Sequence, residues 1–163
     1  MDRMAFNEQI WELRLSMLRL AGSILCSPSD VEDAVSSAVV LAYQKLSTLR
    51  QEECVKSWLL TITVRCCYAQ LKRNRRETPA REVTPPENSL QLPDWHGTLL
   101  EALRSLPPGM REALYLFYYE GMRTQEIARV LHLSRTGVSM RLKRGREMLR
   151  EWLENEELGG KRR

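Results

Sequence analysis

The sequence has few of the residue patterns that mark metal proteins and enzymes. Among its 163 residues are only two histidines and four cysteines, and no two cysteines form a CxxC pair. A structural zinc site takes four Cys or His ligands at characteristic spacings, so we expect no metal. There is also no glycine-rich phosphate loop and no nucleophile motif, so we expect neither catalytic residues nor a cofactor, and an enzyme has little support.

Long apolar runs are absent as well. No stretch reaches the length of a membrane span, so we expect no membrane insertion. The first residues, MDRMAFNEQIW, lack the apolar core and cleavage site of a secretory signal, which predicts a cytoplasmic protein. The adjacent Cys66 and Cys67 are expected in a helix, with at least one of them buried. A redox pair is the alternative, and it would need exposed thiols with a lowered pKa.

The segment 124–152, TQEIARVLHLSRTGVSMRLKRGREMLREW, predicts two short helices joined by a tight turn. Thr124 is the expected cap of the first helix, whose apolar residues recur at helical spacing. His132 and Leu133 form the turn. Ser134 is the expected cap of the second helix, which leaves the first amides of that helix free to meet a phosphate.

The second of these helices has an apolar face and an opposed basic face when its residues are placed 100° apart. The side that must face the protein holds Val138, Leu142, Gly145 and Leu149. The opposite side and its flanks hold Thr136, Ser139, Met140, Arg141, Lys143, Arg144 and Arg146. Between residues 135 and 150 there are six basic residues and one acidic residue. This pattern predicts a recognition helix in a DNA major groove; a solvated amphipathic helix is the alternative.

A second basic cluster lies in the first half of the chain. The net charge is only +4 and the pI is about 9.0. Between residues 65 and 76 there is no acidic residue, and the basic ones are Arg65, Lys72, Arg73, Arg75 and Arg76. Two separate basic clusters indicate a nucleic acid bound at two places.

The hydrophobic pattern predicts an all-α protein of two small helical domains, 1–76 and 97–163, joined by a proline-rich linker at 77–96. Residues 77–95 hold four of the seven prolines, and proline removes a helix donor and stiffens the chain. The second domain packs four short helices into about 60 residues, so its core is limited and a partner would help to complete it.

Local signals predict where several helices begin and end. In the first domain we expect helices over about 6–25 and from Val55 to Arg75, and a third that begins with a capping box of Ser29 and Glu32. In the second domain, Pro108 is expected in the first turn of a helix and Gly121 at the end of that helix.

A family resemblance is carried by three segments of the chain. They are SPSDVEDAVSSAVVLAYQKL, KSWLLTITVRCCYAQLKRNRR and ALRSLPPGMREALYLFYYEGMRTQEIARVLHLSRTGVSMRLKRGREML. The first two resemble region 2, and the third region 4, of the sigma-70 family of bacterial RNA polymerase sigma factors. The resemblance covers about residues 6–76 and 97–153. The short two-domain layout is similar to that of the extracytoplasmic-function (ECF) group.

The resemblance implies a function in transcription initiation. In this family, region 2 binds the clamp helices of the polymerase beta-prime subunit and opens the minus-10 promoter element. Region 4 binds the beta flap and recognises the minus-35 element. The implied partners are therefore core RNA polymerase and promoter DNA, without ATP. Such factors are often held inactive by an anti-sigma factor.

The resemblance also assigns DNA-binding residues. The minus-35 set is Ser134, Arg135, Thr136, Ser139, Met140, Arg141, Lys143, Arg144 and Arg146. Within it, Arg144 could fork onto a guanine and Met140 could meet a thymine methyl, while Arg141 and Arg146 should hold phosphates. The minus-10 set is Trp58, Arg65, Lys72, Arg73, Arg75 and Arg76. The loop at 47–53 matches the part that captures a flipped base, and a buried core role is the alternative for Trp58.

The polymerase-binding set implied by the resemblance is Asp30, Glu32, Asp33, Ser36, Ser37 and Gln44. For its acids the alternative is a solvated helix start, where negative charge favours the helix dipole. The family usually has Gln and an acid where Ser36 and Ser37 stand. It usually has Asn and Asp where this chain has Arg65 and Ala69. These departures leave a second hypothesis open, namely a stand-alone helix-turn-helix transcriptional regulator that has lost promoter melting.

Overall fold

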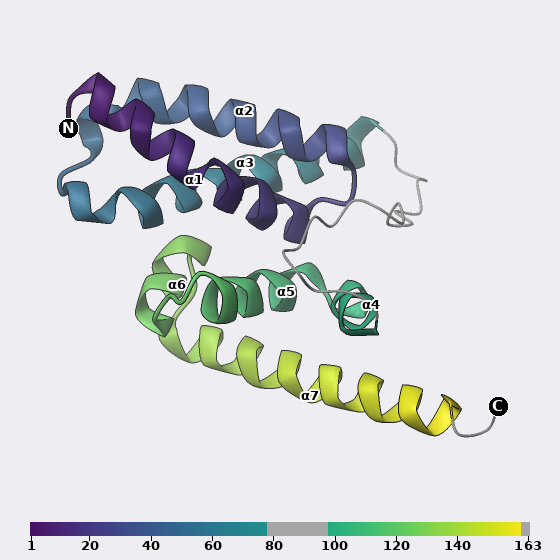
Figure 1. Cartoon of the computed structure of the whole chain (residues 1–163). Coiled ribbons are helices and arrows are strands. Elements are labelled where there is room, and N and C mark those ends of the chain that lie inside the picture. Colours follow the sequence, from purple (N-terminus) through teal and green to yellow (C-terminus); the bar gives the residue numbers. More distant parts are fainter. Residues whose placement is uncertain (78–97, 161–163) are drawn as a thin grey trace.

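The computed structural model describes residues 1–77 and 98–160, and every regular element in that part of the chain is a helix (Figure 1). The all-α prediction is therefore confirmed for the described residues. The expected linker at 77–96 falls outside them, apart from Glu77, which ends a helix. No helix in the described ranges is long and apolar enough to cross a membrane.

The first unit is a bundle of three long helices. They are α1 (Arg3–Ile24), α2 (Pro28–Lys45) and α3 (Val55–Glu77). Short 3-10 turns at Leu46–Thr48 and Glu52–Cys54 join α2 to α3, so the loop expected at 47–53 is partly ordered. Each helix packs on the other two, and fully buried side chains of Phe6, Met17, Ala38 and Leu59 lie between them.

The predicted capping box at the start of α2 is wrong. The helix begins two residues earlier than predicted, at Pro28, with Ser27 as its N-cap and no side-chain cap bond. Proline suits this first position because its φ is preset and its missing N–H has no helical partner there. Ser29 therefore lies inside the first turn, where its hydroxyl is 3.1 Å from the Ser27 hydroxyl.

The second unit comprises α4 (Thr98–Ser105), α5 (Pro108–Leu114), a π-helical turn η3 (Tyr115–Tyr119), α6 (Thr124–Leu131) and α7 (Arg135–Gly160). Pro108 starts α5 as predicted. Gly121, with φ of 65°, ends the run that α5 and η3 form, because this left-handed conformation favours glycine.

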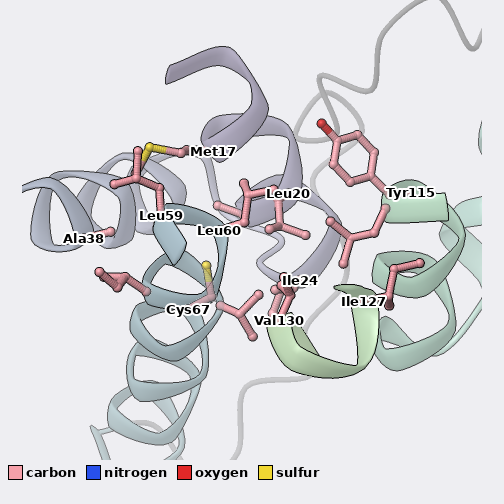
Figure 2. Packing of buried hydrophobic residues seen from close by; sticks show 14 of the residues in the cluster. Met17, Leu20, Ile24, Ala38, Leu59, Leu60, Cys67, Tyr115, Ile127 and Val130 are labelled. Carbon is pink, nitrogen blue, oxygen red and sulfur yellow. The ribbon is translucent and has the colours of Figure 1, made fainter. Parts of the chain in front are cut away.

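The two units share one hydrophobic core. Helices α1 and α3 pack on α5, η3 and α6, and buried residues of both units belong to the same cluster. Figure 2 shows Leu20, Ile24 and Leu60 of the first unit beside Tyr115, Ile127 and Val130 of the second. The small second unit was expected to need a partner for its core, and that partner is the first unit of the same chain.

Candidate nucleic-acid and polymerase interface

The turn of the helix-turn-helix forms where the sequence predicts it. Helix α6 ends at His132, whose φ of 53° reverses the chain, and the Leu133 amide donates to the Ala128 carbonyl at 2.9 Å. The Ser134 hydroxyl accepts the Gly137 amide at 2.9 Å, so the predicted cap of α7 is confirmed.

The predicted cap of α6 is wrong by one residue. Thr124 is the first helical residue and Arg123 is the N-cap. The side chain that caps this start lies inside the helix, because the Glu126 carboxylate accepts the Arg123 amide at 2.8 Å. A glutamate three residues into a helix can cap the preceding backbone amide in this way, which removes the need for a threonine hydroxyl.

Helix α7 buries the predicted apolar face. Val138 and Leu142 are almost fully buried, and Gly145 is buried against α5. A Cβ at Gly145 would lie only 3.0 Å from Leu114 Cδ1 and 3.6 Å from Met110 Cβ. The glycine is therefore what lets α5 and α7 approach this closely.

The opposite face of α7 is open to solvent. The members of the minus-35 set with exposed side chains are Ser134, Arg135, Thr136, Ser139, Met140, Lys143, Arg144 and Arg146. Met140 is 49% exposed, so its apolar side chain is accessible on this face. Arg146 donates to the Tyr118 hydroxyl at 3.0 Å, so an aromatic of η3 borders this face.

Arg141 differs from the other arginines of the minus-35 set because its guanidinium pairs with a buried carboxylate. Its Nη1 lies 3.3 Å from Glu112 Oε1 and 3.3 Å from the Gly109 carbonyl oxygen. Glu112 is only 1% exposed, and burial raises the pKa of its carboxyl to about 7, although the Tyr68 hydroxyl and Arg141 both act to lower it. Arg141 thus supplies the charge that a buried carboxylate needs.

The minus-10 set lies along α3, in three different settings. Lys72, Arg73, Arg75 and Arg76 are exposed on the last turns, where cations also favour the helix dipole. Arg65 donates from Nε to His132 Nε2 at 3.1 Å, so it contacts the turn of the helix-turn-helix. Trp58 is half-buried and packs at 6.2 Å from the Phe6 ring, which is consistent with the core alternative.

The polymerase-binding set lies on α2. Glu32, Asp33, Ser36, Ser37 and Gln44 are all exposed, on one side of the helix. Asp30 is half-buried because its carboxylate accepts from Gln70 at 3.2 Å and from Asn74 at 2.9 Å, both on α3.

Sequence reasoning missed Val40, an apolar side chain that is 58% exposed in the middle of this acidic and polar face. It could have been found, because at 100° per residue Val40 falls between Ser36 and Gln44 on the helix surface.

The paired cysteines behave as helix residues. Cys67 is fully buried, as expected for at least one of the pair, and Cys66 is half-buried. Burial raises the pKa of the Cys67 thiol to about 12, and burial also raises that of Cys66. Both thiols are therefore protonated near neutral pH, and this is the opposite of what a reactive cysteine needs.

Comparison with known proteins agrees with this geometry. Residues 12–77 match the family described as sigma-70 region 2, and residues 96–149 match sigma-70 region 4. A probable RNA polymerase sigma factor of Xanthomonas campestris, RfaY, is 32% identical over 135 residues, and this chain spans about a third (34%) of its length. The ECF sigma factor SigM of Mycobacterium tuberculosis is 27% identical over 150 residues, with 91% of this chain and 76% of the relative covered.

Solved structures show the same fold. The sigma factor RpoE of Bartonella quintana, in complex with the anti-sigma factor NepR, superposes with a TM-score of 0.75 at 23% identity. The match covers 92% of this chain and 97% of that one. CnrH, in complex with the cytosolic domain of CnrY, gives a TM-score of 0.69 at 23% identity over 94% of this chain and 90% of the other.

The fold and the basic face of α7 define a DNA-binding protein of the helix-turn-helix class. The two matched regions, in the order and positions that the sequence resemblance implied, show that the chain belongs to the sigma-70 family. Its relatives include several ECF sigma factors, so the expected assignment to that group is confirmed. Region 2 corresponds to α1–α3 and region 4 to α4–α7.

Proposed function

We propose that this chain is an ECF sigma factor that binds core RNA polymerase and directs it to a promoter with minus-35 and minus-10 elements. The observation that carries the proposal is the exposed basic face of α7, opposite a buried apolar face, in a chain that also contains region 2. The chain works in the cytoplasm and without catalytic chemistry of its own.

Helix α7 recognises the minus-35 element. Arg144, whose side chain is exposed on this face, forks onto the O6 and N7 of a guanine, and Met140 contacts a thymine methyl. Arg146 holds a phosphate. Arg141 contributes through position as well as charge, because its contact with Glu112 fixes the orientation of α7 relative to α5.

Region 2 handles the minus-10 element. The basic end of α3, from Lys72 to Arg76, holds the promoter strand, and the segment 47–53 captures a flipped base. Taking a base out of the stack costs a few kcal/mol, and binding energy supplies it without ATP.

The exposed face of α2 binds the clamp helices of the beta-prime subunit, with Val40 at its centre. Region 4 docks on the beta flap. An anti-sigma factor is a further expected partner, since a solved relative of the same fold was captured with one.

Run-off transcription tests this function. Core polymerase is supplied with a genomic fragment library, with or without the protein, and new transcripts are mapped. We expect specific start sites preceded by two shared elements. Polymerase binding without any transcript would favour the regulator that has lost melting, and would point to Ser36, Ser37, Arg65 and Ala69. Absence of polymerase binding would refute the proposal.

Matched variants test the residues on α7. Arg144→Ala should lose minus-35 discrimination by roughly 1–3 kcal/mol, whereas Arg146→Ala should weaken binding evenly across sequences. Filter binding of matched and scrambled minus-35 duplexes measures both effects. Equal losses on both duplexes for both variants would contradict this division of roles.

A further inference from the structure

Helix α5 lies along α7, and the contacts between the two continue into η3 (Figure 1). Gly145 of α7 packs against Leu114 at the end of α5. The next contact is the bond from Arg146 Nη1 to the Tyr118 hydroxyl, at 3.0 Å. Both side chains are exposed, Tyr118 to 54%. A bond in such a place replaces bonds to water and contributes little to stability, so its main effect is to orient the two groups.

The Tyr118 ring is held in place by the turn that carries it. Phe117 is half-buried and makes an edge-to-face contact with this ring, with 4.9 Å between the ring centroids. The Glu120 amide donates to the Tyr115 carbonyl at 3.2 Å, five residues back, which is the bond of a π-helical turn. Turns of this kind are frequent at functional sites. Tyr118 therefore has a defined place beside α7, although its ring is open to solvent.

The two side chains keep hydrogen-bond donors that the protein does not use. A phenol oxygen that accepts a bond still has its own O–H to donate, and a guanidinium has several N–H groups besides the one in this contact. Within residues 1–77 and 98–160, neither the Tyr118 hydroxyl nor the Arg146 guanidinium makes another hydrogen bond or an ion pair. Donors from two different elements are therefore available, side by side, to an acceptor in solution.

The surroundings of this contact are basic. Lys143 and Arg150 are exposed one turn before and one turn after Arg146, on the same flank of α7. A positive flank with free N–H and O–H donors suits an anion that has several acceptor oxygens. The phosphates of the DNA backbone are such anions, and both arginine and tyrosine side chains bind them in protein–DNA complexes.

We propose that Tyr118 and Arg146 form one phosphate-binding pair for the DNA backbone, at the edge of the groove that α7 enters. Tyr118 orients the Arg146 guanidinium and donates its own O–H to the same phosphate. An arginine that is already held loses less conformational entropy when it binds. The inference rests on the proposed function of α7 in binding minus-35 DNA, and it adds to that contact a residue that lies outside the helix-turn-helix.

Removal of a single hydroxyl tests the phosphate-binding pair. Full-length Tyr118→Phe, Arg146→Ala and the double variant are titrated onto matched and scrambled minus-35 duplexes at several salt concentrations. Tyr118→Phe should weaken binding about fivefold on both duplexes, because a phosphate contact carries no base information. It should leave the slope of log affinity against log salt unchanged, since it removes no charge, whereas Arg146→Ala should reduce that slope by about 0.9.

The double variant measures whether the two residues act together. Because Tyr118 works largely through Arg146, loss of its hydroxyl should weaken binding less than about twofold once Arg146 is alanine. Tyr43→Phe is the matched control, since it removes an exposed tyrosine hydroxyl from α2 and should leave DNA binding unchanged. Urea unfolding of Tyr118→Phe should match that of the wild type, which separates the binding effect from a loss of structure.

Any of four results would overturn the inference. Tyr118→Phe could bind both duplexes as tightly as the wild type, or it could lose affinity for the matched duplex alone, which would indicate base recognition. The losses of the two single variants could simply add in the double variant, or the wild-type chain could bind no duplex even at low salt. The proposed function is decided separately by polymerase binding. If the variants behave as expected on DNA but the chain binds no polymerase, the phosphate-binding pair stands and the proposed function fails.

Discussion

The two units of this protein obtain their cores in different ways. In the first, helices of 22, 18 and 23 residues pack on one another. In the second, α4, α5 and α6 have eight, seven and eight residues, and α5, η3 and α6 complete their burial against α1 and α3. The unit that carries the proposed recognition helix is therefore the one that depends on its neighbour for burial of its core.

Separating the units should produce the largest effect. A fragment of residues 1–77 is expected to fold alone and unfold cooperatively, whereas residues 98–160 alone should lose much of their helix. In the 98–160 fragment, the side chains of Tyr115, Leu116, Ile127 and Val130 are no longer covered by α1 and α3. Each large apolar side chain contributes about 1.5–3 kcal/mol to stability when it is fully buried. Thermal melting followed by circular dichroism measures both fragments. Equal stability would show that the second core is self-sufficient.

Within the second unit, the contact of α7 with α5 should be the least tolerant of added volume. Gly145→Val brings a Cβ to 3.0 Å from Leu114 and adds two methyl groups beyond it. Overpacking of this kind costs roughly 1–3 kcal/mol, occasionally more, and the free energy of unfolding in urea measures it. An unchanged midpoint would mean that α7 can move away from α5 at no cost.

Two arginines three residues apart on α7 sharpen the contrast between stability and DNA recognition. Arg141→Ala leaves the buried carboxylate of Glu112 without its closest cation, so stability should fall by about 1–2 kcal/mol, less than for a fully buried pair because Arg141 is 35% exposed. Arg144→Ala, at an exposed position, should leave stability within about 0.5 kcal/mol. Urea unfolding measures the free energy of unfolding of both variants. Equal losses of stability would contradict a structural role for Arg141 and a surface role for Arg144.

The pH dependence of stability should trace to Glu112, the carboxyl where the two units and α7 meet. The groups that face it are Tyr68 and Cys67 of α3, Arg111 of α5 and Arg141 of α7. Its pKa is raised from 4.5 to about 7, so its contribution to folding is fully present below pH 4.5 and is lost as pH rises through 7. Between pH 4.5 and about 7, the free energy of unfolding should therefore change by about 1–2 kcal/mol less in Glu112→Gln than in the wild type. A pH profile identical to wild type would refute this.

Much of the fold could be predicted because local patterns specify it. The stripe of Val138, Leu142 and Gly145, the cap at Ser134 and the breaks at Pro108 and Gly121 all depend on residues close in sequence. The N-caps Ser27 and Arg123 were not predicted, because the sequence analysis looked for a serine or threonine cap and chose Ser29 and Thr124. In the structure, Pro28 starts α2, and the Glu126 carboxylate accepts the Arg123 amide at the start of α6.

The contacts between the units could not be predicted from the sequence. Tyr68 and Glu112 are 44 residues apart, and Lys56 and Glu120 are 64 apart. No periodic pattern pairs such distant residues. Arg65 and Arg141 were assigned to DNA from their charge, their place in the sequence and the family resemblance, and only the three-dimensional arrangement brings them to His132 and Glu112.

The smallest expected effect is at Gly137, eight residues before Gly145 on the same helix. Replacing it with alanine removes a cost of up to about 1 kcal/mol that glycine imposes on a helix. The new Cβ would also lie 3.1 Å from the Ser134 hydroxyl oxygen, which must stay in place to accept the Gly137 amide. These effects oppose each other, so Gly137→Ala should change the free energy of unfolding by less than about 0.5 kcal/mol. Parallel urea titrations with Gly145→Val make the comparison direct. If both substitutions lowered the free energy of unfolding equally, the loss would come from any substitution of glycine in α7 and not from the packing of α7 on α5.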